Sequence, residues 1–120
     1  GINFVAGSPD VADVNMGNEG DLNDTAYAGN FQAPVFLPHG AVVTGAVVYG
    51  SDAGTTWKLV LAPVDAADTT NTTMATAAVG TEDSSITSAT INNNTTRYCL
   101  NISGMSNGDI IYGARITYTL

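Results

Sequence analysis

Positive charge is the scarcest property of this 120-residue chain. Lys58, Arg97 and Arg115 are the only Lys and Arg residues, against eleven Asp and Glu residues, and the formal net charge is -8. Proteins bind nucleic acid through Lys and Arg side chains that replace the counterions of the phosphates. With three cations so far apart in the sequence, we expect no basic patch, and therefore neither nucleic acid nor an anionic membrane as a partner.

Histidine and cysteine are each present once. His39 stands between Pro38 and Gly40 in a turn-forming sequence and has no second histidine with which to build a metal site. No serine lies in a nucleophile motif, and the acidic residues fall in the N-terminal segment and in turns, so we expect no enzyme. Cys99 has no partner for an intrachain disulfide. We interpret it as a small strand residue, with an intermolecular bridge or a reactive thiol as the alternative.

Long apolar runs are also missing, since none approaches the roughly eighteen residues of a membrane-spanning helix. Charged residues make up 12% of the chain, so its polar surface must come from Thr, Ser, Asn and Gly, as in many extracellular β-proteins. No signal peptide is visible at Gly1, and the composition favours a mature secreted chain over a cytoplasmic one. The expected location is extracellular or at the cell surface, with a virion surface as the alternative.

From Phe31 onward the chain consists of short strand-like runs separated by turn residues, with no helical periodicity. The two prolines of FQAPVFLP predict an edge or bent strand, and further strands are predicted in AVVTGAVVYG, TTWKLVLAP, Met74–Val79 and ITSATI. This spacing predicts an all-β fold for residues 31–120, a jelly-roll-like or Greek-key β-sandwich of about seven to eight strands.

The last two runs have the clearest alternation. Tyr98, Leu100 and Ile102 share one predicted inward face. In the final run the predicted inward residues are Ile110, Tyr112, Ala114, Ile116, Tyr118 and Leu120. The linker between the runs contains Asn-Gly, a favoured turn dipeptide, so we predict that they form a hairpin.

Residues 1–30 differ from the body and form a predicted N-terminal extension. They carry five of the eleven acidic residues and no Lys or Arg, and an apolar run at residues 2–6 precedes an acidic tether rich in Gly and Asn. Such a strand could be added to the open sheet edge of a neighbouring copy, with Ile2, Phe4 and Val5 as anchoring side chains. Because the strands of the body carry few charges, we expect their sheet edges to be poorly protected against pairing with another chain. Repeated head to tail, the contact makes a filament unless its rotation closes a ring.

The acidic tether also offers oxygen ligands for calcium. Its segment DVNMGNEGDLND superficially resembles a calcium-binding loop, but Asn18 stands where such a loop needs glycine, and no helices flank it. Asp10, Asp13, Glu19 and Asp21 therefore remain candidates for a looser calcium site, and the alternative is a solvated tether. No other cofactor is expected.

Five Asn-X-Ser/Thr sequons, none containing proline at X, are candidate glycosylation sites at Asn23, Asn71, Asn93, Asn94 and Asn101. Trp57 and the tyrosines could form a platform for sugar rings. Core packing is the favoured interpretation for Tyr98, Tyr112 and Tyr118, which leaves Trp57 as the candidate glycan-binding aromatic.

The stretches FQAPVFLPHGAVVTGAVVYGSD and NNNTTRYCLNISGMSNGDIIYGARITYTL resemble a β-sandwich module of secreted, surface and phage-associated bacterial proteins, and more weakly the subunits of extracellular filaments. APVFLPHGAVVTG and IIYGARITYT carry most of the resemblance. It implies a non-catalytic extracellular domain and assigns no functional residues.

The sequence therefore predicts a non-enzymatic structural subunit of an extracellular filament, tube or surface layer, which binds copies of itself by adding its N-terminal strand to a neighbour. A viral capsid-decoration or tail-fibre domain is one alternative. A carbohydrate-binding module that uses Trp57 is another.

Overall fold

The computed structural model describes residues 5–6, 14–16, 22–24, 29–66 and 71–120, with side chains from residue 30 onward. All regular structure in these residues is β-strand, and they include no helix long and apolar enough to cross a membrane. The strands are β1 (Val5–Ala6), β2 (Val14–Met16), β3 (Leu22–Asp24), β4 (Gly29–Val35), β5 (Val42–Gly50), β6 (Thr56–Pro63), β7 (Thr72–Ala78), β8 (Thr96–Met105) and β9 (Ile110–Thr119).

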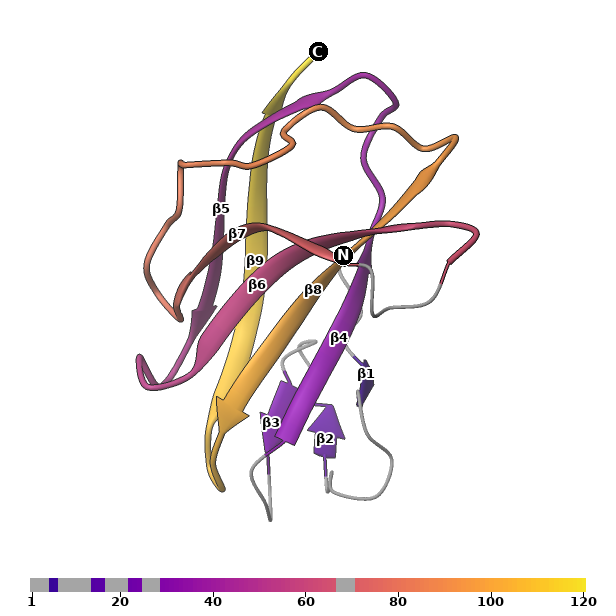
Figure 1. Cartoon of the computed structure of the whole chain (residues 1–120). Helices are drawn as coiled ribbons and strands as arrows, with labels where there is room; N and C mark the ends of the chain where they lie inside the picture. The colour runs from indigo at the N-terminus through magenta and orange to yellow at the C-terminus, as the bar shows by residue number, and fades with distance from the viewer. Residues whose placement is uncertain (1–4, 7–13, 17–21, 25–28, 67–70) are drawn as a thin grey trace.

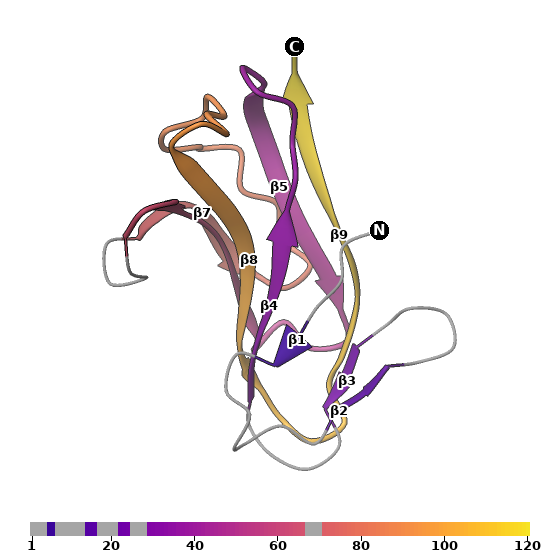
Figure 2. The ribbon, with the colours of Figure 1, turned by 90° about the vertical axis from the view of Figure 1, so that its right-hand side faces the viewer.

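The strands form two antiparallel sheets that pack as a β-sandwich (Figures 1 and 2). The first sheet has the order β1-β4-β8-β6-β7 and the second the order β2-β3-β9-β5. The body consists of β4 to β9, which are seven to ten residues long, while β1 to β3 contribute only two or three residues each. The all-β sandwich is thus confirmed, with six body strands in place of the predicted seven to eight.

The missing body strand is ITSATI, residues 86–91, which was wrongly predicted to be a strand. The connection from β7 to β8 that contains it pairs with β5 through isolated bridges, Asp83 with Ala46 and Thr90 with Val42, and not through a continuous ladder. Ser88 has a φ of 54°, in the left-handed region that interrupts a strand. Neither face of the run is continuously apolar, so packing against the core does not keep it in an extended strand conformation.

The predicted hairpin between the last two strands is also wrong. β8 belongs to the first sheet and β9 to the second, and the turn between them crosses from one layer to the other. Asp109 closes this turn, since its backbone N–H donates to Ser106 O at 3.0 Å and its side chain accepts from Ser106 N at 2.8 Å. Both strands carry an apolar face, and in opposite layers the two faces meet across the core.

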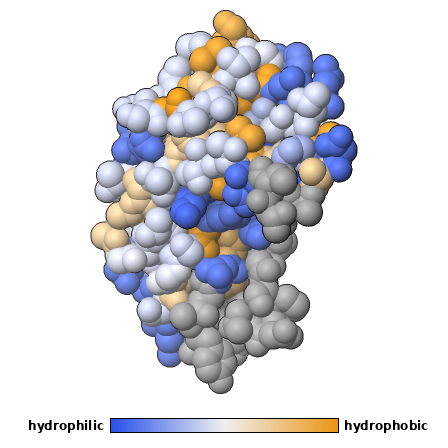
Figure 3. All heavy atoms as spheres, viewed as in Figure 1, coloured by the Kyte–Doolittle hydropathy of each residue, from blue (hydrophilic) through white to orange (hydrophobic). Residues whose placement is uncertain are grey.

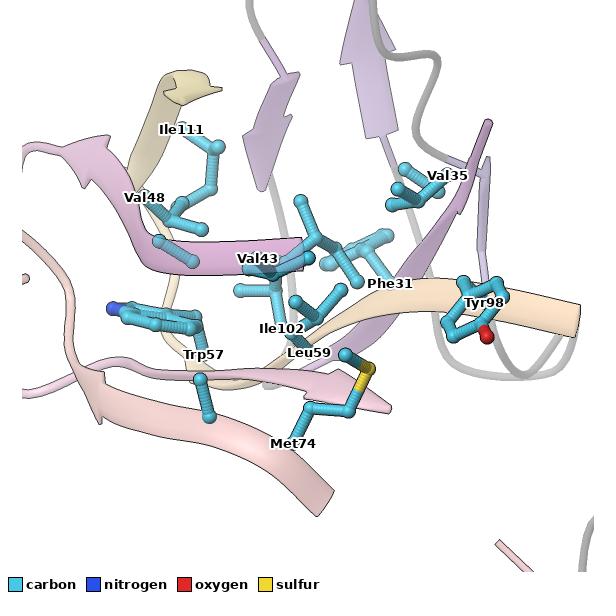
Figure 4. Close-up of a cluster of buried hydrophobic side chains, with 14 of the residues drawn as sticks. Phe31, Val35, Val43, Val48, Trp57, Leu59, Met74, Tyr98, Ile102 and Ile111 are labelled. Atoms are coloured by element: carbon cyan, nitrogen blue, oxygen red, sulfur yellow. The ribbon is translucent and has the colours of Figure 1, made fainter. Parts of the chain in front are cut away.

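The core lies between the two sheets and includes Trp57, Leu59 and Ile102, each at most 1% exposed (Figure 4). The predicted inward face of β8 is confirmed, because Tyr98, Leu100 and Ile102 are all buried. The indole N–H of Trp57 donates to the carbonyls of Ala78 and Thr81, each at 3.1 Å. The buried indole therefore has its polar atom satisfied, as a core tryptophan requires.

The predicted inward face of β9 is wrong along part of the strand. Ile111 is the buried residue at its start, while Tyr112 is 58% exposed. The register with β5 shifts at this point, because Gly50 pairs with Ile111 and Tyr49 with Gly113, so Tyr112 is the extra residue of a bulge. Beyond the bulge Ala114 and Ile116 pack against the core as predicted, but Tyr118 is 38% and Leu120 93% exposed where the sandwich ends.

Candidate functional site

The N-terminal segment adds strands to both sheets on the same side of the body. β1 pairs with β4, placing Val5 opposite Gln32 and Ala6 opposite Phe31. β3 pairs with β9, and β2 pairs with β3. Of the three predicted anchors, Val5 lies in β1, and Ile2 and Phe4 lie outside the described residues.

The other side of the sandwich is closed by the connection from β7 to β8. Its backbone pairs with the β5 edge, where Ala46 and Asp83 exchange two hydrogen bonds of 3.0 Å each. It also covers part of the β7 edge, because Thr87 N donates to Met74 O at 2.9 Å and Thr76 N donates to the Asp83 side chain at 3.0 Å. The expectation of lightly protected edges is therefore wrong on this side.

Two stretches of edge on the side of the N-terminal strands are left without a partner strand among the described residues: residues 112–119 of β9, beyond the two residues that pair with β3, and a shorter stretch of β4. β1 covers β4 only at Phe31 and Gln32, so residues 33–35 pair with β8 on one side and with no described strand on the other. We call residues 33–36 the acceptor edge. It bears no charge, and Phe36 at its end is 89% exposed. β1 is the outermost strand of this sheet, so the predicted edge position holds only for residues 33–35, where Pro34, which has no N–H, fits.

The outer face of the first sheet forms a concavity of about 680 Å³, which we call the outer concavity. Figure 3 views this face and shows hydrophobic residues in a depression among hydrophilic ones. β6 contributes Val60 and Ala62 to the lining, each 6% exposed. β4 and the residue after it contribute Gln32, Pro34 and Phe36, and β8 contributes Arg97, Cys99 and Asn101.

Strand register aligns these side chains in rows across the sheet. Gln32, Asn101 and Lys58 form a polar row, and Pro34, Cys99 and Val60 form the next, less polar row. Gln32 and Asn101 also line a smaller concavity of about 230 Å³ that reaches Lys58. Lys58 and Arg97, two of the three cations of the chain, thus lie on the same face, which their distance in sequence did not reveal.

Hydrogen bonds hold part of the lining in place. The Arg97 guanidinium donates to Pro63 O at 2.6 Å and to Ala66 O at 3.0 Å, which fixes the end of β6 against β8. The Cys99 thiol donates to Asn101 Oδ1 at 3.4 Å. Cys99 is a half-buried residue of β8, in line with the prediction of a small strand residue.

Three of the predicted glycosylation asparagines, Asn71, Asn93 and Asn101, line the outer concavity, and Asn94 is the exposed neighbour of Asn93. The Asn93 amide donates to Leu37 O at 2.8 Å, and its backbone N–H donates to His39 Nδ1 at 3.1 Å. Asn23 lies in β3 opposite Ile110 of β9. Only the folded chain shows that Asn71, Asn93 and Asn101 face one site.

The calcium candidates Asp10, Asp13, Glu19 and Asp21 lie outside the described residues. Within the described part of the chain, no three His, Cys, Asp or Glu side chains come close enough together to hold a metal ion.

Trp57, the candidate sugar platform, is 0% exposed and packs in the core. A ring that no ligand can reach cannot stack on a sugar, so glycan binding through Trp57 is ruled out.

Comparison of the chain with protein-family models, with curated proteins and with solved structures finds no match. The resemblance to a bacterial β-sandwich module therefore stays a prediction from the quoted stretches. The site must be interpreted from its own geometry.

Proposed function

We propose that this protein is a non-enzymatic structural subunit that polymerises by adding its N-terminal strand to the acceptor edge of a neighbouring copy. The observation that supports this proposal best is the pairing of β1 with β4, which matches an N-terminal strand to a particular edge. The partner is a second copy of the chain, and the assembly is an extracellular or cell-surface filament, tube or layer.

The pairing within one chain is short enough to exchange. Two residue pairs join β1 to β4, and a backbone hydrogen bond contributes about 0.5–1.5 kcal/mol net. Ordering each residue of the strand costs about 1–2 kcal/mol of backbone entropy, so a contact of this size is marginal. A strand from a neighbour could make the same bonds and continue along residues 33–36, which no described strand covers.

The closed side of the sandwich disfavours assembly there, because the connection from β7 to β8 covers β5 and part of β7. On the other side, β4 and part of β9 are open, and the pairing of β1 with β4 favours β4 as the edge that accepts the strand. Strand addition at one edge, by a donor elsewhere on the molecule, is a head-to-tail contact, and such contacts propagate.

We also infer a Greek-key-like path through the sandwich. β7 and β8 flank β6 in one sheet, yet the chain passes from one to the other along β5 of the second sheet. Such a return by a long connection is typical of Greek-key and jelly-roll sandwiches.

Deleting residues 1–8 tests the proposed function. The shortened chain is expected to keep the β-sheet circular dichroism of the full chain and to form no polymers under the electron microscope. Adding back a synthetic peptide of residues 1–8 should bind the shortened chain, because it restores the missing strand. A folded shortened chain that still polymerises would overturn the proposal.

The viral alternative makes a different prediction for the same micrographs. A capsid-decoration or tail-fibre domain would form closed oligomers or bind a virion lattice in place of an open polymer.

A further inference from the structure

We propose that the outer concavity is a binding site for an acidic saccharide, one that carries a carboxylate on a sugar ring. The site lies on the outer face of β4, β8 and β6 and does not involve Trp57. The inference goes beyond the proposed assembly and does not depend on it, because the concavity is complete within a single chain.

The size and the floor of the outer concavity fit a ligand of this class. Its volume of about 680 Å³ lies within the range of about 300–1,000 Å³ that ligand pockets have. Pro34, Val60 and Ala62 give it an apolar strip, against which the C–H face of a sugar ring can pack. Phe36, at the rim, supplies an accessible aromatic ring.

Amide groups around this strip match the hydroxyls of a sugar. An Asn or Gln side chain both donates and accepts hydrogen bonds, as a hydroxyl does. The side chains of Gln32 and Asn71 make no hydrogen bond within the described part of the chain, and Asn101 makes only the one from Cys99 to its oxygen. These amides therefore have donors and acceptors available for a ligand.

Charge favours an acidic ligand over a neutral one. The chain has a net charge of -8, yet the described residues that line the two adjoining concavities include no Asp or Glu. Lys58 stands in the same row as Gln32 and Asn101 and has no hydrogen bond or ion pair to any described residue. Arg97 adds a second cation, held in place by two backbone carbonyls. Lys58 can therefore pair with a ligand carboxylate, with Arg97 four residues further along the ladder, and two cations are too few for a polyphosphate chain.

A glycan array carrying uronic-acid, sialic-acid and neutral oligosaccharides tests this inference on the full chain. We expect signals on acidic glycans and at least about tenfold weaker signals on their neutral counterparts. The Asn101→Leu and Gln32→Leu variants should each weaken the acidic signals about tenfold or more, the loss expected for a hydrogen bond to a charged or polar ligand group. Lys58→Gln should weaken them about threefold and leave neutral glycans unaffected.

Arg115→Gln is the matched control, because it also removes one positive charge but lies on β9 of the other sheet. It should leave all signals unchanged. Unfolding curves of each variant show whether a lost signal reflects the site or the fold, and Gln32, which is exposed, is the substitution least able to disturb folding.

Three results would overturn the inference: no signal on any acidic glycan, equal signals on acidic and neutral glycans, or acidic signals that persist in both folded Leu variants. None of them bears on polymerisation, which is scored separately by electron microscopy of the same samples.

Discussion

Val5 of β1 lies directly opposite Gln32 of β4 in an antiparallel ladder. The structure has this pair within one chain, and the proposed strand exchange would form it between two. Opposite residues in such a ladder have Cα atoms about 4.5–5.5 Å apart, which suits a disulfide. The pair is therefore the natural place to distinguish exchange from self-pairing.

Cysteines at these two positions should cross-link neighbouring copies. In a Cys99→Ser background, the Val5→Cys and Gln32→Cys double variant is expected to give a ladder of multimers on a non-reducing gel. The Val5→Cys single variant should reach dimers at most, because it has one thiol. If the double variant runs only as an internally linked monomer, β1 stays on its own body and strand donation fails.

A charge on the acceptor edge should block assembly without unfolding the chain. Phe36 is 89% exposed, so Phe36→Lys removes little buried surface, but it places a cation where a neighbour's strand would pair. Light scattering should show slower or absent polymerisation. Tyr112→Lys is the control on the other sheet, and it should polymerise normally. Equal effects of the two variants would contradict a role for this edge.

Replacing Gly50 by alanine should destabilise the fold much more than the same change at Gly113. A Cβ at Gly50 would stand 2.6 Å from Ile110 O and 2.9 Å from Val79 Cγ1, whereas a Cβ at Gly113 would meet nothing within 4 Å. Gly50→Ala should lower the free energy of unfolding by about 2 kcal/mol or more, as overpacked sites do. Gly113→Ala should change it by less than about 1 kcal/mol, in either direction. Urea denaturation compares the two, and similar losses would show that the register at the β9 bulge is misplaced.

Trp57→Phe should destabilise the fold and spare any glycan binding. It removes the N–H that donates to Ala78 O and Thr81 O and leaves a cavity in the core. Together these changes should cost about 2–4 kcal/mol of unfolding free energy. If a variant that remains folded loses its glycan signal, Trp57 takes part in glycan binding, contrary to what its burial indicates.

Expression in a host with N-glycosylation machinery should place a glycan on Asn94 in preference to Asn93. The two sequons overlap, so crowding allows one to be used, and the Asn93 amide is already engaged with Leu37 O. Peptide mapping after enzymatic deglycosylation reports which asparagine is converted to aspartate. Predominant conversion of Asn93 would contradict this reason for the preference.

Local alternation was enough to predict much of the body. The inward face of β8 is as the sequence indicates, because Tyr98, Leu100 and Ile102 follow a period of two and are all buried. The same rule failed in β9, where one extra residue at Tyr112 reverses the alternation. The position of a bulge depends on how the strand pairs with its neighbour, so the sequence pattern of β9 alone does not predict it.

By itself, the sequence determined that this chain is an all-β sandwich with almost no positive charge, because alternation and composition are properties of single strands and of the whole chain. Only the tertiary structure decided which edge is closed and which is open. It also decided that Lys58, Arg97 and Asn101 lie on one face of the first sheet while Trp57 is buried. These relationships depend on register and sheet order, which come from contacts between residues far apart in the chain, and the same local pattern is compatible with many such pairings.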